Sequence, residues 1–465
     1  MFIKKEPSPF LIYLMKEKTE NSILKSLLKL AIPIVLANIL HSAYQITDTF
    51  WVGRLGSGAV AAVSLSFPII FFIISLGGGM AVAGGILVAQ YKGKKDYSKI
   101  NFMAGQTFLM MTFASILLSV LGYLVSPIII KLMGADPFVV ESAISYMRIS
   151  FLGLIFLFIF FSFQSLMRGV GDVRAPALIV LSTVLLNLVL DPLFIMGYKS
   201  IPAFGVTGAA IATILTQALS AIIGVIILFR GKHGIRIKKI DLKPKLRVIK
   251  RIFLLGLPAS ISQSTRSLGM AMMIFIVAGF GTTVTAAYGI GGRILSFIII
   301  PALGLSAATS TLVGQSIGAK KIKRAEQVAK TSAKLSFIVL TILGILLFIF
   351  AKEISVLFIP GEEAVTNIAS MFIKIMALSF GFVGVQVVLD GVLVGAGSTF
   401  TAMVLTIISL WLLRVPLAYI LSKYTKLNEN GIWWAFPIAN IIALLFTYLW
   451  YKKGRWKEKE ITKEI

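Results

Sequence analysis

The chain has 465 residues, of which 57% are hydrophobic and only 14% are charged, and its formal net charge is +26. Soluble domains carry roughly 25% charged residues, so much of the apolar surface of this chain has to face lipid. The positive charge does not indicate a nucleic-acid partner, because the basic residues lie in short segments between apolar runs with few aromatic residues among them. The absence of cysteine excludes a disulfide framework, a thiolate metal site and a cysteine nucleophile.

Twelve apolar runs follow one another along the chain, and each has the length of about 20 residues that a helix needs to cross a membrane. The sequence therefore predicts an all-α integral membrane protein with twelve transmembrane helices. In chain order, the runs lie at about 28–50, 58–84, 101–130, 140–166, 172–197, 205–229, 252–278, 283–310, 332–351, 365–390, 398–421 and 430–450.

Lysine and arginine concentrate before the first run and after the second, fourth, sixth, eighth and twelfth runs. The loops on the other side are much poorer in both, so the positive-inside rule predicts that both termini are cytoplasmic. We expect a multi-pass protein of the cell (plasma) membrane. The basic linker 230–251 divides an N-terminal lobe, 28–229, from a C-terminal lobe, 252–450, and the cytoplasmic ends are 1–27 and 451–465.

The second half repeats the first at a constant offset in residue number. Pro258 falls on Pro33, and the stretch from Leu312 to Lys320 falls on that from Leu87 to Lys95, with matching Leu, Val, Gln, Gly and Lys. Six spans in each repeat predict two pseudo-symmetric six-helix bundles that enclose a central cavity and expose it alternately to each side by rocking. Pro33 and Pro258 each remove a helix hydrogen bond, which permits either a static bend or a moving kink.

One face of the first run is polar. Spacings of three and four residues place side by side on this helical face Asn38, His41, Ser42, Gln45 and Asp48. Because polar groups are costly in lipid, we expect this face to line the cavity, together with Gln164 and Gln263 of later runs. His41 is either a hydrogen-bonded packing residue or a proton relay.

Two carboxylates and a carboxamide lie at similar predicted depths in the membrane. Asp48 lies about 20 residues into its run and Asp191 about 19 into its own, and Asn187 precedes Asp191 by one helical turn. Together, Asp48, Asn187 and Asp191 could bind a proton or coordinate Na⁺ through oxygen ligands. We expect one of these coupling ions and no other cofactor. The alternative is that each aspartate caps a helix end that faces water.

The second half lacks this constellation. Met273 takes the place of Asp48, and Val415 takes that of Asp191. The charged residues in the later spans are instead Arg266, Asp390 and Arg414. Asp390 is either an ion-pair partner of one of these arginines or a second ion site.

Several stretches together resemble the MATE (multidrug and toxic compound extrusion) family, and the lack of a matching second-half acid resembles its DinF-like branch. The stretches are ITDTFWVGRLG from Ile46, VAQYKGKKD from Val88, RGVGD from Arg168, LNLVLDP from Leu186, GAAIAT from Gly208 and LLRVP from Leu412. The resemblance implies outward transport of drugs or toxins coupled to inward H⁺ or Na⁺. It also implies a cation-coupling site formed by Asp48, Tyr146, Asn187, Asp191 and Thr213.

The leading hypothesis is a secondary active multidrug efflux transporter that antiports amphipathic, mainly cationic, organic compounds against H⁺ or Na⁺. A lipid-linked oligosaccharide or lipid flippase of the same superfamily is the alternative, and it would have a strongly cationic cavity. We expect no enzyme, since no nucleophile–base pair or metal set is visible, and no channel, since no filter segment is present. The protein is expected to act as a monomer.

Overall fold

The computed structural model describes residues 9–134, 136–459, 461 and 462, and nearly all of the secondary structure in this part of the chain is helical. The N-terminal half contains α1 (Pro9–Gly53), α2 (Ser57–Lys94), α3 (Tyr97–Leu132), α4 (Pro137–Val170), α5 (Arg174–Met196) and α6 (Val206–Arg230). After the short helix η1 (Lys239–Leu242) come α7 (Leu246–Ala278), α8 (Thr282–Ile298), α9 (Ile300–Gly318), α10 (Ile322–Ile349), α11 (Ala351–Phe358), α12 (Glu363–Ala377), α13 (Phe380–Gly395), α14 (Thr399–Ile407), the π-helix η2 (Ile408–Arg414), α15 (Val415–Lys423), α16 (Glu429–Lys452) and η3 (Arg455–Glu458).

The predicted helical membrane fold is confirmed. Within the described residues, eleven helices are long and apolar enough to cross a membrane, and α12 with α13, bent by 57° at their junction, would make a twelfth. Two of the eleven are joined segments: α8 with α9 forms the span Thr282–Gly318, and α14 with η2 and α15 forms the span Thr399–Lys423. The helices extend beyond several apolar runs, because polar residues at their ends continue the helix outside the apolar core.

The internal repeat is visible in the backbone. Lys95 and Lys320, which occupy equivalent positions in the two repeats, both lie just after the end of a helix in the left-handed conformation, with φ of 61° and 58°. Gly56 and Gly281, a second equivalent pair, have φ of 101° and 97°. Positive φ is strained for a residue with a side chain, so the same unusual turn at matching positions shows that both halves fold by the same pattern.

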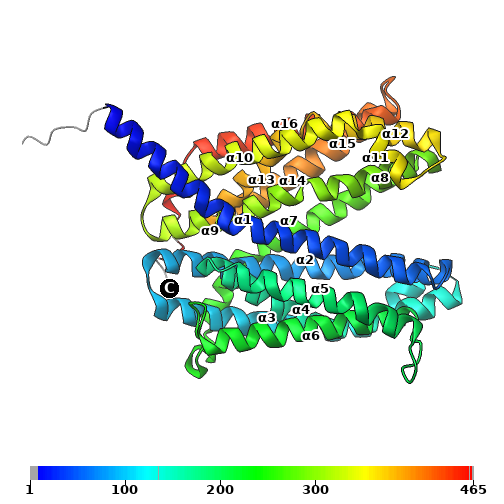
Figure 1. The fold of residues 1–465 in the computed structure, drawn as a ribbon, viewed down its shortest axis with the longest axis horizontal. Helices are drawn as coiled ribbons and strands as arrows, with labels where there is room; N and C mark the ends of the chain where they lie inside the picture. The colour runs from blue at the N-terminus through cyan, green and yellow to red at the C-terminus, as the bar shows by residue number, and fades with distance from the viewer. Residues whose placement is uncertain (1–8, 135, 460, 463–465) are drawn as a thin grey trace, which may run out of the picture.

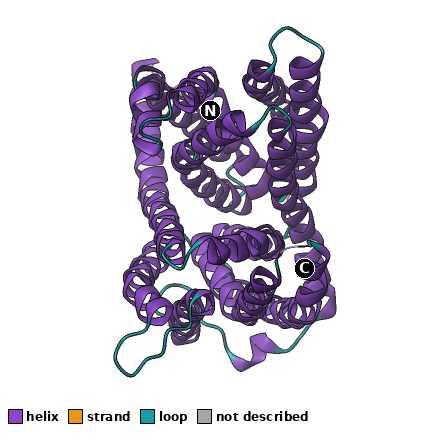
Figure 2. Cartoon of the chain, turned by 90° about the vertical axis from the view of Figure 1, so that its right-hand side faces the viewer, coloured by secondary structure: helices purple, strands orange, loops and turns teal. Residues whose placement is uncertain are grey.

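The helices form two groups that lie side by side (Figure 1). The group that contains α2 to α6 is the N-lobe, and the group that contains α8 to α16 is the C-lobe, and both are seen roughly end-on in Figure 2. The chain enters at the beginning of α1 and leaves after α16 at the same end of the bundle (Figure 1). We call this the terminal end of the bundle.

The first half of α1 packs against the C-lobe, and the first half of α7 packs against the N-lobe. Ile23 and Leu27 of α1 belong to a buried apolar cluster with residues of α9, α10 and α13 in the C-lobe. Val248 and Ile252 of α7 belong to the buried cluster of α2, α3 and α4 in the N-lobe. Burial of these side chains on the opposite lobe therefore ties the two lobes together at the terminal end. Pro33 and Pro258 lie within these two helices.

Two glycines seal the lobes together near the terminal end. A Cβ on Gly93 of α2 would lie 2.0 Å from the carbonyl oxygen of Gln315, and a Cβ on Gly318 of α9 would lie 1.9 Å from that of Gln90. The two glycines are equivalent positions of the repeat, and so are the two glutamines. The repeated Gln-x-x-Gly motif thus places each glycine on the backbone of the opposite helix, and only a residue without a side chain permits this approach. We call this contact the glycine seal.

The replacement Gly318→Leu should open the glycine seal. Overpacking of a close contact costs about 1–3 kcal/mol, so the variant should have a lower melting temperature and separate the lobes at the terminal end. The natural chain has no cysteine, so a single Ala307→Cys in the interior can report on access. We expect a hydrophilic maleimide applied from the terminal end to label this cysteine faster in the Gly318→Leu background.

The matched control is Gly289→Leu, because a Cβ on Gly289 of α8 meets no atom within 4 Å. It should leave both the labelling rate and the melting temperature near those of the parent. Equal labelling in the Gly318→Leu and Gly289→Leu backgrounds would contradict a seal at Gly318.

Candidate functional site

A cavity of about 530 Å³ lies between the two lobes. Its walls come from α1, α2 and α4 on one side and from α7, α9, α13 and α14 on the other. Ligand pockets for small molecules are typically ~300–1,000 Å³ and are mostly apolar, with a few polar groups. This cavity fits that description. Its polar and charged lining residues are Asn38, Ser75, Gln164, Ser165, Arg168, Ser262, Gln263, Arg266, Ser306, Ser310, Thr311, Asp390 and Thr399.

Of the seven residues predicted to line the cavity, the structure places three in its lining: Asn38, Gln164 and Gln263. The other four lie outside this lining, and they are His41, Ser42, Gln45 and Asp48. The imidazole ring of His41 instead stacks on the ring of Tyr44, with 6.0 Å between the ring centroids. The polar face of α1 is longer than the cavity, so only its earlier part reaches the lumen.

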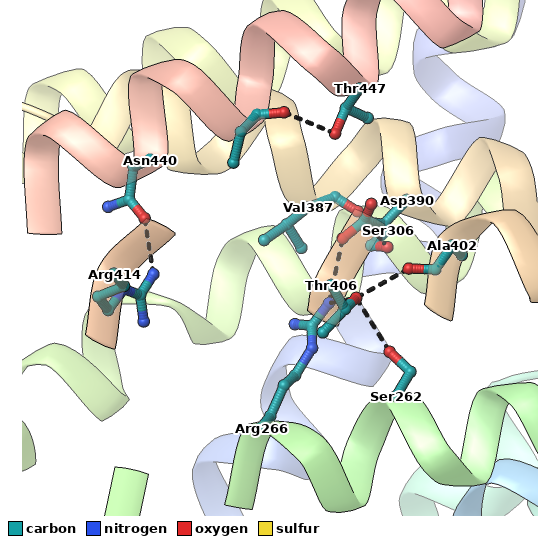
Figure 3. Close-up of polar contacts among 11 residues, drawn as sticks. Ser262, Arg266, Ser306, Val387, Asp390, Ala402, Thr406, Arg414, Asn440 and Thr447 are labelled. Atoms are coloured by element: carbon teal, nitrogen blue, oxygen red, sulfur yellow. Dashed lines mark hydrogen bonds and ion pairs between the residues drawn. The ribbon is translucent and has the colours of Figure 1, made fainter. Parts of the chain in front are cut away.

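An ion pair stands in the C-lobe wall of the cavity (Figure 3). The guanidinium Nη2 of Arg266 donates to the carboxylate Oδ2 of Asp390 over 3.1 Å, and the side chains are 39% and 14% exposed. The Thr406 hydroxyl lies 3.5 Å from the same Nη2 and accepts a hydrogen bond of 3.0 Å from Ser262. Of the two sequence interpretations of Asp390, the structure shows the ion pair. The other carboxylate oxygen of Asp390, Oδ1, is buried without a hydrogen-bond partner among the described residues.

A second group of polar side chains lies within the N-lobe, outside the cavity lining. We call it the N-lobe polar cluster, and it consists of Tyr44, Asp48, Tyr146, Asn187, Asp191 and Thr213. Helix packing brings these residues together, because α1 packs against α5 and α6. Asn187 Nδ2 donates to Asp191 Oδ1 over 3.0 Å, and these side chains are 1% and 0% exposed. The hydroxyls of Tyr44 and Thr213 share a hydrogen bond of 2.5 Å.

The charges in the N-lobe polar cluster act on one another. Asp191 interacts electrostatically with Asp48, and the Tyr146 hydroxyl interacts with both carboxylates. Three buried oxygens have no hydrogen-bond donor in the described part of the chain: Asp48 Oδ1, Asn187 Oδ1 and Asp191 Oδ2. Buried acceptors without a donor are rare and need an explanation. A bound proton or a hard cation would satisfy such oxygens.

All five residues that the sequence resemblance suggested for cation coupling therefore lie in one cluster. Sequence reasoning missed Tyr44, although a signal existed. Tyr44 precedes Asp48 by four residues, so both lie on the same helical face. The cluster contains only two acidic side chains, and no group of three or more His, Cys, Asp or Glu suited to a metal ion occurs in the residues described here. Carboxylate, carboxamide and hydroxyl oxygens are groups that can bind a proton or Na⁺.

The C-lobe has a cation where the N-lobe has carboxylates. Arg414, at the end of the π-helix η2, is adjacent to the position equivalent to Asp191. Its Nη2 donates to Asn440 Oδ1 over 2.7 Å, and its guanidinium lies 4.9 Å from the centroid of the Phe436 ring. Asn440 in turn donates to Ser379 over 3.4 Å.

Comparison with known proteins gives a consistent result. The protein-family model MatE matches residues 33–193 and 258–420. The probable multidrug resistance protein YoeA of Bacillus subtilis (strain 168) is 31% identical over 454 residues, which cover 97% of this chain and 98% of that protein.

Two solved structures also match closely. A MATE crystal structure in complex with MaL6 has a TM-score of 0.88 at 26% identity and covers 93% of this chain and 97% of its own. A multidrug resistance MATE family transporter of the MOP superfamily in an outward-facing conformation has a TM-score of 0.86 at 26% identity, and the match covers 92% of this chain and 95% of its own.

The Tyr44–Thr213 hydrogen bond should stabilise the N-lobe polar cluster. A double-mutant cycle with Tyr44→Phe, Thr213→Val and the double variant should give a coupling free energy of about 1 kcal/mol, the net value of a typical hydrogen bond. The measurement is the free energy of unfolding in mixed micelles. Additive effects of the two substitutions would show that the two hydroxyls do not interact in the folded protein.

Proposed function

Because the chain belongs to the MatE family of multidrug transporters, we propose that it exports amphipathic organic compounds from the cell in exchange for H⁺ or Na⁺. In this proposal the N-lobe polar cluster binds the coupling ion and the cavity between the lobes binds the substrate. The chain is placed in the plasma membrane with both termini in the cytoplasm, as the distribution of basic residues predicts. One copy of the chain contains both lobes, so a monomer suffices for the cycle.

The observation that carries the proposal is the N-lobe polar cluster. A charged side chain at the centre of a membrane helix costs roughly 2.5–3.5 kcal/mol on insertion scales. Two carboxylates within interaction range raise that cost, because like charges repel. Binding of a cation or a proton would remove it and would supply the partner that three buried oxygens lack. Such a site alternates between an occupied and an empty state of different energies, which an antiporter requires.

Helix α1 connects the proposed ion site to the proposed substrate site. It carries Asp48 of the N-lobe polar cluster and Asn38 of the cavity lining, ten residues or about 15 Å apart along the helix. The first half of the same helix packs on the C-lobe. A change in the occupancy of the cluster can therefore act on the cavity and on the lobe interface through one rigid element. Pro33 lies near the end of the segment of α1 that packs on the C-lobe, and it is the proposed hinge of α1, as Pro258 is of α7.

The glycine seal closes the lobes at the terminal end, and α2 and α7 also approach each other closely beside the cavity. Gly79 of α2, for example, lies against the backbone of Ser260. Helix α8 packs on C-lobe helices. If the termini are cytoplasmic, this arrangement corresponds to the outward-open state of an alternating-access cycle. Opening of the glycine seal would produce the opposite state.

The second candidate is a flippase for lipid-linked oligosaccharides. The guanidinium groups of Arg168 and Arg266 in the cavity favour it, because such a cargo is anionic. The cavity volume of about 530 Å³ argues against it, because this volume suits a drug-sized molecule. We therefore place the export of small molecules first.

Proteoliposomes test the proposal. Purified protein would be reconstituted, and norfloxacin transport would be followed first under an imposed pH gradient and then under a Na⁺ gradient. Norfloxacin is a zwitterion, so the result does not depend on which charge the cavity prefers. We expect one gradient to drive transport, and we expect Asp48→Asn and Asp191→Asn each to reduce the driven rate about tenfold or more, since the ion site is lost.

The control variant is Glu141→Gln, which removes an exposed carboxylate of α4 outside the N-lobe polar cluster. It should transport at the rate of the unmodified protein. Transport that does not respond to either gradient, or that persists in both aspartate variants, would reject the proposed ion site. The flippase for lipid-linked oligosaccharides would then become the leading hypothesis.

A further inference from the structure

The charged side chains that line the cavity are Arg168, Arg266 and Asp390. Two arginines and one aspartate leave one positive charge in excess. Asp48 and Asp191 are not among the lining residues. The charge that a substrate meets in the cavity is therefore opposite to the charge in the N-lobe polar cluster.

The two arginines differ in how they are compensated. Arg266 is neutralised in part by its ion pair with Asp390, which Figure 3 shows in the C-lobe wall. Arg168 projects from α4 in the opposite lobe, and no described residue forms an ion pair or a hydrogen bond with its side chain. An uncompensated guanidinium in a half-buried site is unfavourable unless a ligand supplies the missing negative charge.

The remaining polar groups of the cavity offer hydrogen-bond donors. Asn38, Gln164 and Gln263 each present a carboxamide, and among the described residues none of these side chains is engaged in a hydrogen bond. The NH₂ groups of carboxamides can donate to the oxygens of an anion. The apolar walls include Phe71 and Phe161, which suit a flat hydrophobic ring system.

We propose that the cavity binds amphipathic organic anions, with the anionic group against Arg168 and the apolar part against the phenylalanine walls. This inference rests on the proposed function and specifies the substrate class of that transporter. Arg266 is a second, weaker contact for the anion, because Asp390 competes for its guanidinium. Arg168 and Arg266 come from different lobes, so an anion between them would also bridge the lobe interface.

Matched dyes of opposite charge test the proposal. Fluorescein is an anion and rhodamine 123 a cation at neutral pH, and both share the xanthene ring system. Dissociation constants would be measured by fluorescence anisotropy with the purified full-length protein in nanodiscs. We expect fluorescein to bind more tightly than rhodamine 123. Arg168→Gln should weaken fluorescein binding about tenfold, the value of one charge-assisted contact, without weakening rhodamine 123.

Two further variants separate charge from structure. Arg168→Lys retains the positive charge and should keep most of the fluorescein affinity. If the guanidinium had a purely structural role, Arg168→Lys would weaken fluorescein binding as much as Arg168→Gln does. Asp390→Asn releases Arg266 from its carboxylate and should tighten fluorescein binding. Arg293→Gln removes an exposed arginine of α8 outside the cavity lining and should change neither dissociation constant.

Two kinds of result would overturn the inference. Tighter binding of rhodamine 123 that weakens in Asp390→Asn would show a cation site at Asp390. Fluorescein binding that is indifferent to Arg168→Gln, or absent altogether, would exclude the anion contact. Either result would leave the proposed exporter intact as long as norfloxacin transport follows an ion gradient and depends on Asp48. Loss of that transport would instead reject the proposed function.

Discussion

The backbone contact between α2 and α9 is the constraint on which the rest of the structure depends. Gly93 and Gly318 each lie against a carbonyl oxygen of the opposite helix, and no other residue type would fit there. This contact brings the two lobes together at one end, and the exchanged first halves of α1 and α7 add buried apolar surface at the same end. The cavity lies beyond the seal, so its shape and its access both follow from this approach of two helices.

Charges of opposite sign occupy separate places in the same bundle. The N-lobe polar cluster contains carboxylates without sufficient donors, whereas the cavity contains a guanidinium without a counterion. In lipid, each imbalance is costly until a ligand corrects it. In the proposed cycle, separate sites for a cation and for an organic substrate would avoid direct competition between the two, and α1 would connect them. The guanidinium of Arg414 in the C-lobe would disfavour a second, equivalent cation site in that half.

Much of the candidate site was predictable from local sequence patterns. Asn187 and Asp191 are one turn apart on a helix, so their contact follows from helical geometry alone. Tyr44 was predictable by the same rule but was not included among the polar residues of its run. A shared helical face with Asn38 predicts that His41, Ser42, Gln45 and Asp48 also line the cavity. That face extends farther than the lumen, and periodicity carries no information about where a cavity ends.

The sequence by itself determined the membrane class, the number of spans and the repeat, because hydrophobic length and a constant offset between matching residues are one-dimensional properties. It also indicated which polar residues share a helix. Only the tertiary structure decided which carboxylates meet, that Asp390 pairs with Arg266, and that arginines rather than Asp48 and Asp191 face the cavity. Those facts depend on how each helix is rotated against its neighbours, and rotation is set by packing between segments distant in the chain.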